Sequence, residues 1–326
     1  MDLLEALKTG TVAEYGMPER AITTVISQLF IYKEKVVKVY KKEPFFFADL
    51  SNAVSRKEFV FEDFFWNNTA APEIYRHLWG VVEKGGSLTL VPATQGEDFI
   101  IEMSRIDDSK TLTKLLSNAS LRPELTAQFV DALVDILGVL TKERSAQLKH
   151  LFDKGLYAIM QEDIKSLRSW LYDSSEHIPK QTTDEIIEVL LRAFEKEPYF
   201  TSIDTLQLSA AIDNNSDNML LVDGRPSFID IMPPMDIWRV VDEYATISRL
   251  FVDIEVLGNK KLGDVARAAY AKYQRDIPPV ACLMHELRAA CIQWPYRYML
   301  KQDDVAKKFG EYAQKKMAEL ETALSS

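Results

Sequence analysis

Apolar residues in the first hundred positions follow the alternation that is typical of β-strands. The segments concerned are rich in β-branched and aromatic residues, with glycines in the later turns, and we expect strands over 21–32, 35–42, 74–82, 87–91 and 98–103. The polar pair Lys33-Glu34 between the first two segments predicts an antiparallel hairpin. A helical pattern over 50–71 follows, with Ser51 or Asn52 as its N-cap. The pattern therefore predicts a small antiparallel sheet with one helix inserted after its second strand.

From Ile106 onward the apolar positions recur with the period of an α-helix. One broad apolar stripe has members three and four residues apart: Phe129, Leu133, Ile136, Leu137 and Leu140. Further helices are expected near 158–173, 182–196, 236–257, 261–275, 280–300 and 303–323. Two short apolar runs, 219–222 and 227–231, interrupt this pattern. Because they flank Asp223-Gly224, they predict a β-hairpin within a helical region.

Composition and charge limit the kinds of domain organisation and binding partner that the chain can have. The chain has 326 residues, which suggests two domains or one two-lobed unit, and 47% of its residues are hydrophobic. A formal net charge of −10 argues against a nucleic-acid or membrane partner and permits a cationic substrate. We see no apolar stretch that is long enough to span a bilayer and no secretory signal. The two cysteines, Cys282 and Cys291, would face opposite sides of a helix, so we expect reduced thiols and a cytoplasmic location.

Polar residues gather around the expected hairpin. Asp213 and Asn218 lie in the polar loop before its first strand, and Asp230 lies at the end of its second strand. Since a hairpin brings its outer ends together, Asn218 and Asp230 should be neighbours. Carboxylate and amide oxygens suit Mg²⁺, and a remaining carboxylate could accept a proton from a hydroxyl. The alternative interpretation is a solvated turn, where Asp and Asn are common.

Lys38 is the one charged residue among apolar neighbours in Val36-Val37-Lys38-Val39-Tyr40. Such a lysine either faces solvent or faces inward, where it needs an anion. The helix that follows offers Glu58, Glu62 and Asp63. Kinase-type phosphoryl transfer uses an ordered set of residues along the chain. The set consists of a strand lysine, a helical acid, a loop aspartate, an asparagine five residues later and a further aspartate, and this chain has all five in that order.

Four segments carry a resemblance to a known family: TVISQLFIYKEKVVKVYKKEPFFFADLS, FEDFFWNNTAAPEIY, DNNSDNMLLVDGRPSFIDIM and RVVDEYATISRLFVDIEVLG. The chain resembles the aminoglycoside-phosphotransferase-like family, a branch of the protein-kinase-like fold, from about residue 22 to 320. This resemblance implies an α+β, bilobal fold. A small antiparallel-sheet N-lobe with one helix would span 1–103. A larger, mainly helical C-lobe would span 104–326, with its catalytic loop in 211–232 and a helical insertion at about 150–205.

The resemblance also implies how a nucleotide, ATP or GTP, would be held. Lys38 matches the lysine that contacts the α- and β-phosphates. Glu62 lies nearest the helical glutamate that pairs with this lysine, although Asp63 is one position away. Backbone groups of Ser104 and Ile106 match the interlobe hinge that meets adenine.

For the chemical step, the resemblance implies that Asp213 is the catalytic aspartate and that Asn218 and Asp230 bind Mg²⁺. The implied reaction moves the γ-phosphate of the nucleotide to a hydroxyl of a small molecule, which the acidic composition allows to be cationic.

The catalytic loop departs from the family pattern. The family reads H-G-D-x-H-x-x-N, whereas residues 211–218 read AIDNNSDN, so both histidines and the glycine are replaced. Two alternatives stay open, the first because of these losses and the second because the chemistry of phosphoryl transfer is shared. One is a pseudokinase that binds nucleotide and regulates a protein partner, and the other is a protein kinase that acts on Ser or Thr.

Overall fold

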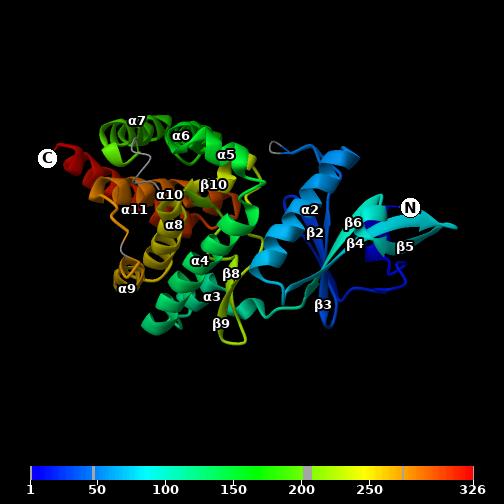
Figure 1. The fold of residues 1–326 in the computed structure, drawn as a ribbon. Helices are drawn as coiled ribbons and strands as arrows, with labels where there is room; N and C mark the ends of the chain where they lie inside the picture. The colour runs from blue at the N-terminus through cyan, green and yellow to red at the C-terminus, as the bar shows by residue number, and fades with distance from the viewer. Residues whose placement is uncertain (1, 46–47, 201–207, 274, 326) are drawn as a thin grey trace. The chain divides into compact units, whose positions relative to one another are not determined.

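The computed structural model describes residues 2–45, 48–200, 208–273 and 275–325 (Figure 1). These residues divide into two compact units. The first unit consists of residues 1–108 and 227–235, and the second consists of residues 109–226 and 236–326. In the part of the chain that the structure describes, each helix is too short or too polar to cross a membrane.

The first unit is built on a six-stranded antiparallel sheet in the order β1-β2-β3-β6-β4-β5. Its strands are β1 (Arg20–Thr23), β2 (Ser27–Ile31), β3 (Lys35–Tyr40), β4 (Tyr75–Lys84), β5 (Ser87–Pro92) and β6 (Asp98–Ser104). Its helices are α1 (Leu3–Lys8), α2 (Ala53–Ala70) and the short 3₁₀ turn η1 (Ala93–Gln95). The sheet with a helix after its lysine strand confirms the predicted N-terminal architecture.

Alternation along β3 gives the sheet two different faces. Val37 and Val39 point to one face, where they join an apolar cluster with Leu3 and Leu7 of α1. Lys38 and Tyr40 point to the opposite face, which α2 covers. There the ring of Tyr40 meets the ring of Phe59 edge-on, with 5.2 Å between their centroids. Strand β3 therefore contributes apolar side chains to the layer between the sheet and α1, and partly polar side chains to the layer between the sheet and α2.

Two details of the N-terminal region differ from the prediction. The segment 21–32 is not one strand, because residues 24–26 form a turn in which Thr24 and Ser27 exchange hydrogen bonds of 2.9 Å. This turn contains neither Gly nor Pro, so its sequence gives no ordinary signal. The short helix α1 was also not expected. The N-cap of α2 is Asn52, whose side chain accepts from Val54 N and Ser55 N, as one of the two predicted alternatives.

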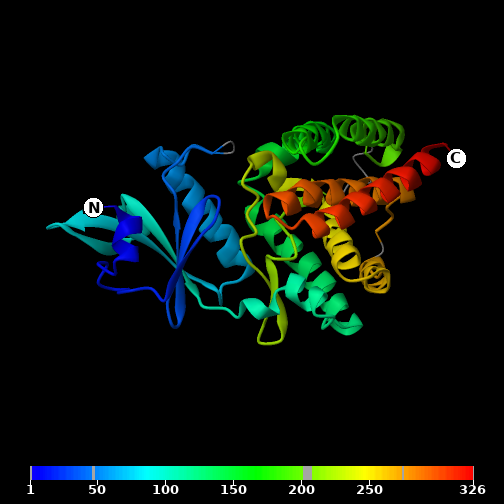
Figure 2. The same cartoon turned by 180° about the vertical axis from the view of Figure 1, so that it is seen from behind.

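The second unit is mainly helical. Its helices are α3 (Leu112–Ser117), α4 (Pro123–Arg144), α5 (Lys149–Lys154), α6 (Leu156–Asp173), α7 (Lys180–Lys196), α8 (Glu243–Leu257), α9 (Lys260–Ala271), α10 (Pro279–Met299) and α11 (Asp303–Ser325). Its 3₁₀ turns are η2 (Asp108–Lys110), which begins at the unit boundary, η3 (Pro198–Phe200) and η4 (Asp236–Arg239). Helix α10 packs against α6, α7, α8 and α11, and α10 and α11 run side by side (Figure 2). The α+β fold class predicted from the sequence is confirmed.

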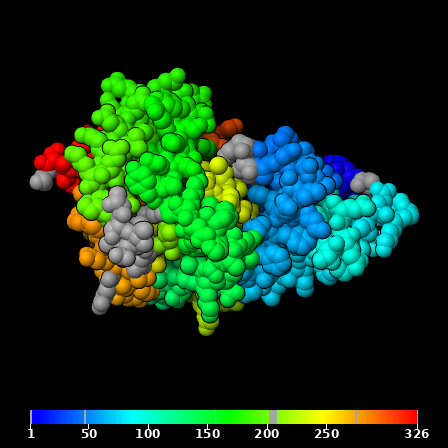
Figure 3. Space-filling view, turned by 45° about the horizontal axis from the view of Figure 1, so that its top comes forward, coloured from blue at the N-terminus to red at the C-terminus, as the bar shows by residue number. Residues whose placement is uncertain are grey.

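The predicted insertion at about 150–205 contains α5, α6 and α7. Figure 3 shows these helices, coloured green to yellow-green, on the surface of the second unit. An apolar cluster joins α6 and α7 to α10 through residues that include Leu171, Leu190 and Leu287. Residues 201–205 of the predicted insertion lie outside the described residues.

Short strands accompany the helices: β7 (Leu208–Ala210) pairs with β10 (Val240–Asp242), and β8 (Met219–Val222) pairs with β9 (Arg225–Phe228). The hairpin around Asp223-Gly224 is confirmed, although its second strand ends at Phe228 and leaves Asp230 beyond it. The expected helix over 236–257 is wrong in its first third. Residues 236–242 form η4 and β10, and α8 begins after Asp242, whose carboxylate accepts from Tyr244 N at 3.0 Å.

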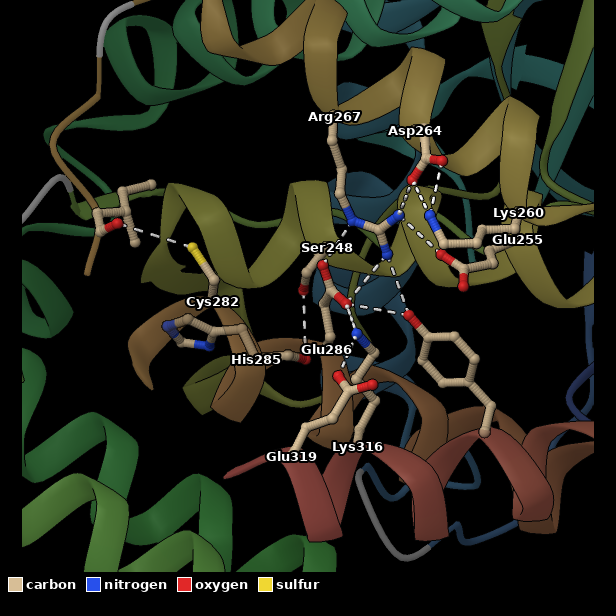
Figure 4. Close-up of polar contacts among 12 residues, drawn as sticks. Ser248, Glu255, Lys260, Asp264, Arg267, Cys282, His285, Glu286, Lys316 and Glu319 are labelled. Carbon is tan, nitrogen blue, oxygen red and sulfur yellow. Dashed lines mark hydrogen bonds and ion pairs between the residues drawn. The ribbon is translucent and has the colours of Figure 1, made fainter. Parts of the chain in front are cut away.

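An ionic cluster centred on a buried carboxylate holds four helices of the second unit together (Figure 4). The carboxylate of Glu286 on α10 accepts from Arg267 of α9 at 2.9 and 3.0 Å and lies 3.0 Å from Lys316 Nζ of α11. The guanidinium of Arg267 also donates to Glu255 of α8 at 2.7 Å. Because Glu286 is buried and binds two cations, it is the central anion of this cluster.

Candidate active site

Lys38 is the centre of a buried polar group in the first unit. Its side chain is 5% exposed, and its ammonium lies 3.1 Å from Asp63 Oδ2 and 2.6 Å from Asp230 Oδ1. The structure therefore selects the inward-facing alternative for Lys38. Since a buried ammonium is costly without an anion, the two carboxylates are required for this placement.

The helical partner of Lys38 is Asp63, so the prediction that placed Glu62 nearest to this lysine is corrected by one position. Consecutive residues of a helix point about 100° apart, and a shift of one residue changes which side chain meets the sheet. Asp63 faces the sheet with 2% of its side chain exposed. Aspartate is one methylene shorter than glutamate, so its helix must approach β3 closely to reach the ammonium.

Two residues that the sequence analysis did not single out hold the carboxylates in place. Asn67, one turn after Asp63 on α2, donates from its amide to Asp63 O at 2.8 Å and to Asp63 Oδ1 at 2.9 Å. Its amide oxygen accepts from Ile231 N at 3.0 Å, and the hydroxyl of Tyr75 accepts from Asp230 N at 2.9 Å. The spacing of four residues between Asp63 and Asn67 is the only sequence signal that could have found either residue.

Burial and charge act in opposite directions on Lys38. Burial alone would lower the pKa of Lys38, but the carboxylates of Asp230 and Asp63 outweigh it and raise this pKa well above its usual value. The ammonium also lies 4.9 Å from the centroid of the Tyr40 ring. Burial raises the pKa of Tyr40 and of Tyr75, so both remain neutral hydroxyls. Lys38 is therefore a fixed cation at neutral pH.

Asp230 combines a constrained backbone with an accessible side chain. Its φ of 51° lies in the left-handed region, which is uncommon for a residue with a side chain. The hydrogen bond from its backbone N–H to Tyr75 supports this conformation. Its side chain is 56% exposed, whereas that of Lys38 is buried. The carboxylate thus contacts the lysine and remains open to solvent, a position from which it could also bind a cation.

In the second unit, Asp213 and Asn218 lie next to each other in the loop before β8. The amide nitrogen of Asn218 donates to Asp213 O at 3.1 Å. Asp213 Oδ1 accepts from Arg249 Nη2 of α8 at 2.9 Å, and 37% of the Asp213 side chain is exposed. The structure therefore brings together the two predicted loop residues and adds an arginine that the sequence analysis did not single out.

Buried polar side chains bind the loop that contains Asp213 and Asn218. The backbone N–H of Ser216 donates to Asp253 Oδ2 at 2.8 Å, and the amide of Asn214 donates to Thr246 O at 2.7 Å. The buried guanidinium of Arg297 donates to Asp217 Oδ2 at 2.9 Å. Burial raises the pKa of Asp253, while Arg297 and Arg249 oppose this rise. The polar loop is therefore not a simple solvated turn, because buried groups fix several of its residues.

The remaining predicted positions lie as follows. Ser104 ends β6, and its backbone N–H donates to Ile74 O at 2.7 Å. Ile106 is half-buried in the segment that follows β6. Their contacts with adenine stay predictions. The expected proximity of Asn218 and Asp230 also stays a prediction, because these residues belong to different units.

A metal ion at this site would need ligands beyond the acidic side chains. Among the described residues, no group of three or more His, Cys, Asp or Glu side chains could hold a metal ion. The side-chain oxygens that each unit offers are nevertheless of the kind that suits Mg²⁺, which is commonly bound by one or two carboxylates together with phosphate oxygens. Asp230 offers an accessible carboxylate. Asn218 offers an amide oxygen, the kind of ligand that Mg²⁺ accepts, while its amide nitrogen donates to Asp213 O.

Several solved structures are similar to this chain over almost its whole length. A GDP complex of an aminoglycoside 2'-phosphotransferase-IIIa mutant is 8% identical, with a TM-score of 0.55 and 98% of each chain covered. A choline kinase from Cryptosporidium parvum is 14% identical, with a TM-score of 0.54, and the match covers 94% of this chain and 90% of that chain. A ternary complex of streptomycin, ATP and the phosphotransferase APH(2")-IIa is 18% identical, with a TM-score of 0.51, and the match covers 95% and 98% of the two chains.

The chain has the protein-kinase-like fold of these phosphotransferases. The fold that the resemblance implies is thus confirmed by solved structures that share it at low sequence identity. No protein-family model matches the chain.

Curated sequences are similar over a short segment only. Uncharacterized proteins of Mycobacterium tuberculosis and Mycobacterium bovis are 36% identical over 66 residues, which is 20% of this chain. The match spans 13% of the length of these curated relatives, so it carries no statement about their overall activity.

Proposed function

We propose that this protein is a phosphotransferase that moves the γ-phosphate of ATP or GTP to a hydroxyl of a small molecule. The observation that carries the proposal is the placement of Lys38, a buried and permanently charged ammonium that contacts Asp63 and the exposed Asp230. Phosphoryl transfer needs such fixed charges more than it needs covalent help from the protein.

Five side chains have a chemical role in this proposal. Lys38 would bind the phosphates of the nucleotide, and Asp63 would keep its ammonium in position. Asp213 would orient the acceptor hydroxyl and take its proton. Asn218 and Asp230 would hold Mg²⁺, which supplies positive charge to the phosphate oxygens when it is bound.

The solved structures support this choice of substrates. The similar phosphotransferases are described with GDP or with ATP and streptomycin, and another of them is a choline kinase. These molecules suggest a nucleotide together with a small hydroxyl compound for this chain as well. The net charge of −10 favours a neutral or cationic acceptor over a strongly anionic one.

Nucleotide binding is the first test. We expect ATP with Mg²⁺, or GTP with Mg²⁺, to raise the melting temperature by several degrees, because a ligand at about 100 times its Kd adds about 2.7 kcal/mol of stability. Differential scanning fluorimetry with each nucleotide, with and without Mg²⁺, measures this shift.

The matched variants are Asp230→Asn and Asp223→Asn. Asp230→Asn should lose most of the Mg²⁺-dependent part of the shift, because it removes the proposed carboxylate ligand. Asp223 lies exposed in the β8–β9 turn at a φ of 49°, which asparagine tolerates, so Asp223→Asn should keep the whole shift. If neither nucleotide shifts the melting temperature of the wild-type chain, the proposal fails.

A nucleotide-binding module without turnover is the second candidate, because the loop over 211–218 has lost both family histidines and the glycine. This candidate predicts the same thermal shift but no release of phosphate from ATP or GTP. A phosphate-release assay on the wild-type chain separates the two candidates.

A further inference from the structure

We propose that Arg249 is the positioning residue for Asp213, so that helix α8 supplies the positive charge that the catalytic loop itself lacks. This inference rests on the proposed phosphotransfer and names a residue that acts through the aspartate. Asp213 Oδ1 accepts from Arg249 Nη2 at 2.9 Å.

Arg249 is more buried than Asp213, as expected for a residue that positions a more accessible reactive group. The Arg249 side chain is 14% exposed, whereas the Asp213 side chain is 37% exposed. Within the described residues, this contact is the single hydrogen bond or ion pair of the Arg249 side chain, and its buried Nε has no partner. Asp213 is thus the hydrogen-bond partner of the guanidinium, while its carboxylate can still be reached by an acceptor.

Helix α8 holds the loop at two points. Arg249 binds the side chain of Asp213, and Asp253, one turn later on the same helix, accepts from the backbone N–H of Ser216 at 2.8 Å. The helix is fixed in the unit by fully buried residues that include Leu250 and Phe251. A carboxylate tied to such a helix keeps one orientation, and this is what a group that aligns a hydroxyl requires.

The charge of the loop explains why a cation is needed at this position. Residues 211–218 contain Asp213 and Asp217 and no basic residue. Arg297 of α10 binds Asp217, and Arg249 of α8 binds Asp213. A nucleoside triphosphate is strongly anionic and would be repelled by two bare carboxylates. With both carboxylates paired, the loop has no local excess of negative charge.

A double-mutant cycle on nucleotide hydrolysis tests the inference, with water as the acceptor and ATP with Mg²⁺ as the substrate. Asp213→Asn is expected to lower kcat about 10²-fold, and Arg249→Gln to lower it about 10-fold, with the KM for ATP little changed. The double variant should be no slower than Asp213→Asn alone, because the effect of Arg249 on kcat is exerted through Asp213. Arg249→Lys, which keeps the charge, should recover part of the lost kcat.

The control is Arg168→Gln, which breaks another arginine–aspartate pair of the same unit, to Asp184 at 2.7 Å, and should keep the wild-type kcat. Additive losses in the double variant, a loss that appears only in KM, or a wild-type rate in Arg249→Gln would each overturn the inference. If Arg249→Gln does not fold, as judged by its circular dichroism, Arg249→Lys carries the same cycle. Failure of the proposed function is recognised separately, because the wild-type chain would then neither bind nor hydrolyse ATP.

Discussion

Replacing Lys38 with methionine should lower the free energy of unfolding of the first unit by about 3–5 kcal/mol, because it leaves Asp63 buried without its cation. The side chain of Asp63 is 2% exposed, and the amide of Asn67 cannot replace a full positive charge. Burial already raises the pKa of Asp63, so the variant will gain part of its stability back by binding a proton. Urea denaturation followed by circular dichroism at pH 7 measures the loss.

The control for this variant lies on the same strand. Lys35 contacts Glu102 at 3.2 Å and is 38% exposed, so Lys35→Met should change the stability by less than about 1 kcal/mol. The double variant Lys38→Met/Asp63→Asn removes both charges and should be more stable than Lys38→Met alone. Equal losses for Lys35→Met and Lys38→Met would contradict the buried pair as the source of the effect.

Replacing Glu286 with glutamine is expected to destabilise the second unit by about 3–5 kcal/mol. The change leaves the cations of Arg267 and Lys316 without the central anion of their cluster (Figure 4). Glu319 is the matched control. It also contacts Lys316 at 3.0 Å, but it is 39% exposed, so Glu319→Gln should cost less than about 1 kcal/mol. Urea denaturation of the three chains at pH 7 gives the comparison.

The effect of Glu286→Gln should depend on pH in a defined direction. Burial alone would raise the pKa of Glu286, but hydrogen bonds and charge from Arg267, together with Lys316, lower this pKa below its usual value. A group with a lowered folded-state pKa stabilises the protein fully above its unfolded-state pKa, and this stabilisation is lost as the pH falls through the folded-state value. The stability difference between wild type and Glu286→Gln should therefore be constant near neutral pH and become smaller below about pH 4.3. A difference that grows on acidification would refute this assignment.

The sequence predicted most of the elements that depend on local pattern. Alternation marked the strands, and Asp223-Gly224 marked the hairpin, because both signals lie within a few residues. The β10 strand was missed, since its partner β7 is some thirty residues away and its own three residues continue an apolar pattern that also fits a helix. The turn at 24–26 was missed because Thr and Ser close it with side-chain hydrogen bonds in place of glycine.

The residues of the candidate site were likewise predictable only where their signal lies in the order and spacing of the chain. Lys38, Asp213, Asn218 and Asp230 could be singled out because their order and spacing carry chemical meaning. The choice of Asp63 over Glu62 depends on the rotation of α2 against the sheet. The contacts of Tyr75 and Arg249 depend on packing between segments that are far apart in the chain. Such contacts leave no periodic pattern in the sequence.

The alternation along β3 has a practical consequence for protein engineering. A shift of the pairing register of β3 by one residue would place Lys38 in the apolar layer under α1 and a valine opposite Asp63. Extra residues introduced between β2 and β3 invite such a shift. The turn at Gly85-Gly86 lies at an exposed hairpin end with room around both glycines, and it is the safer place for a reporter or an affinity label.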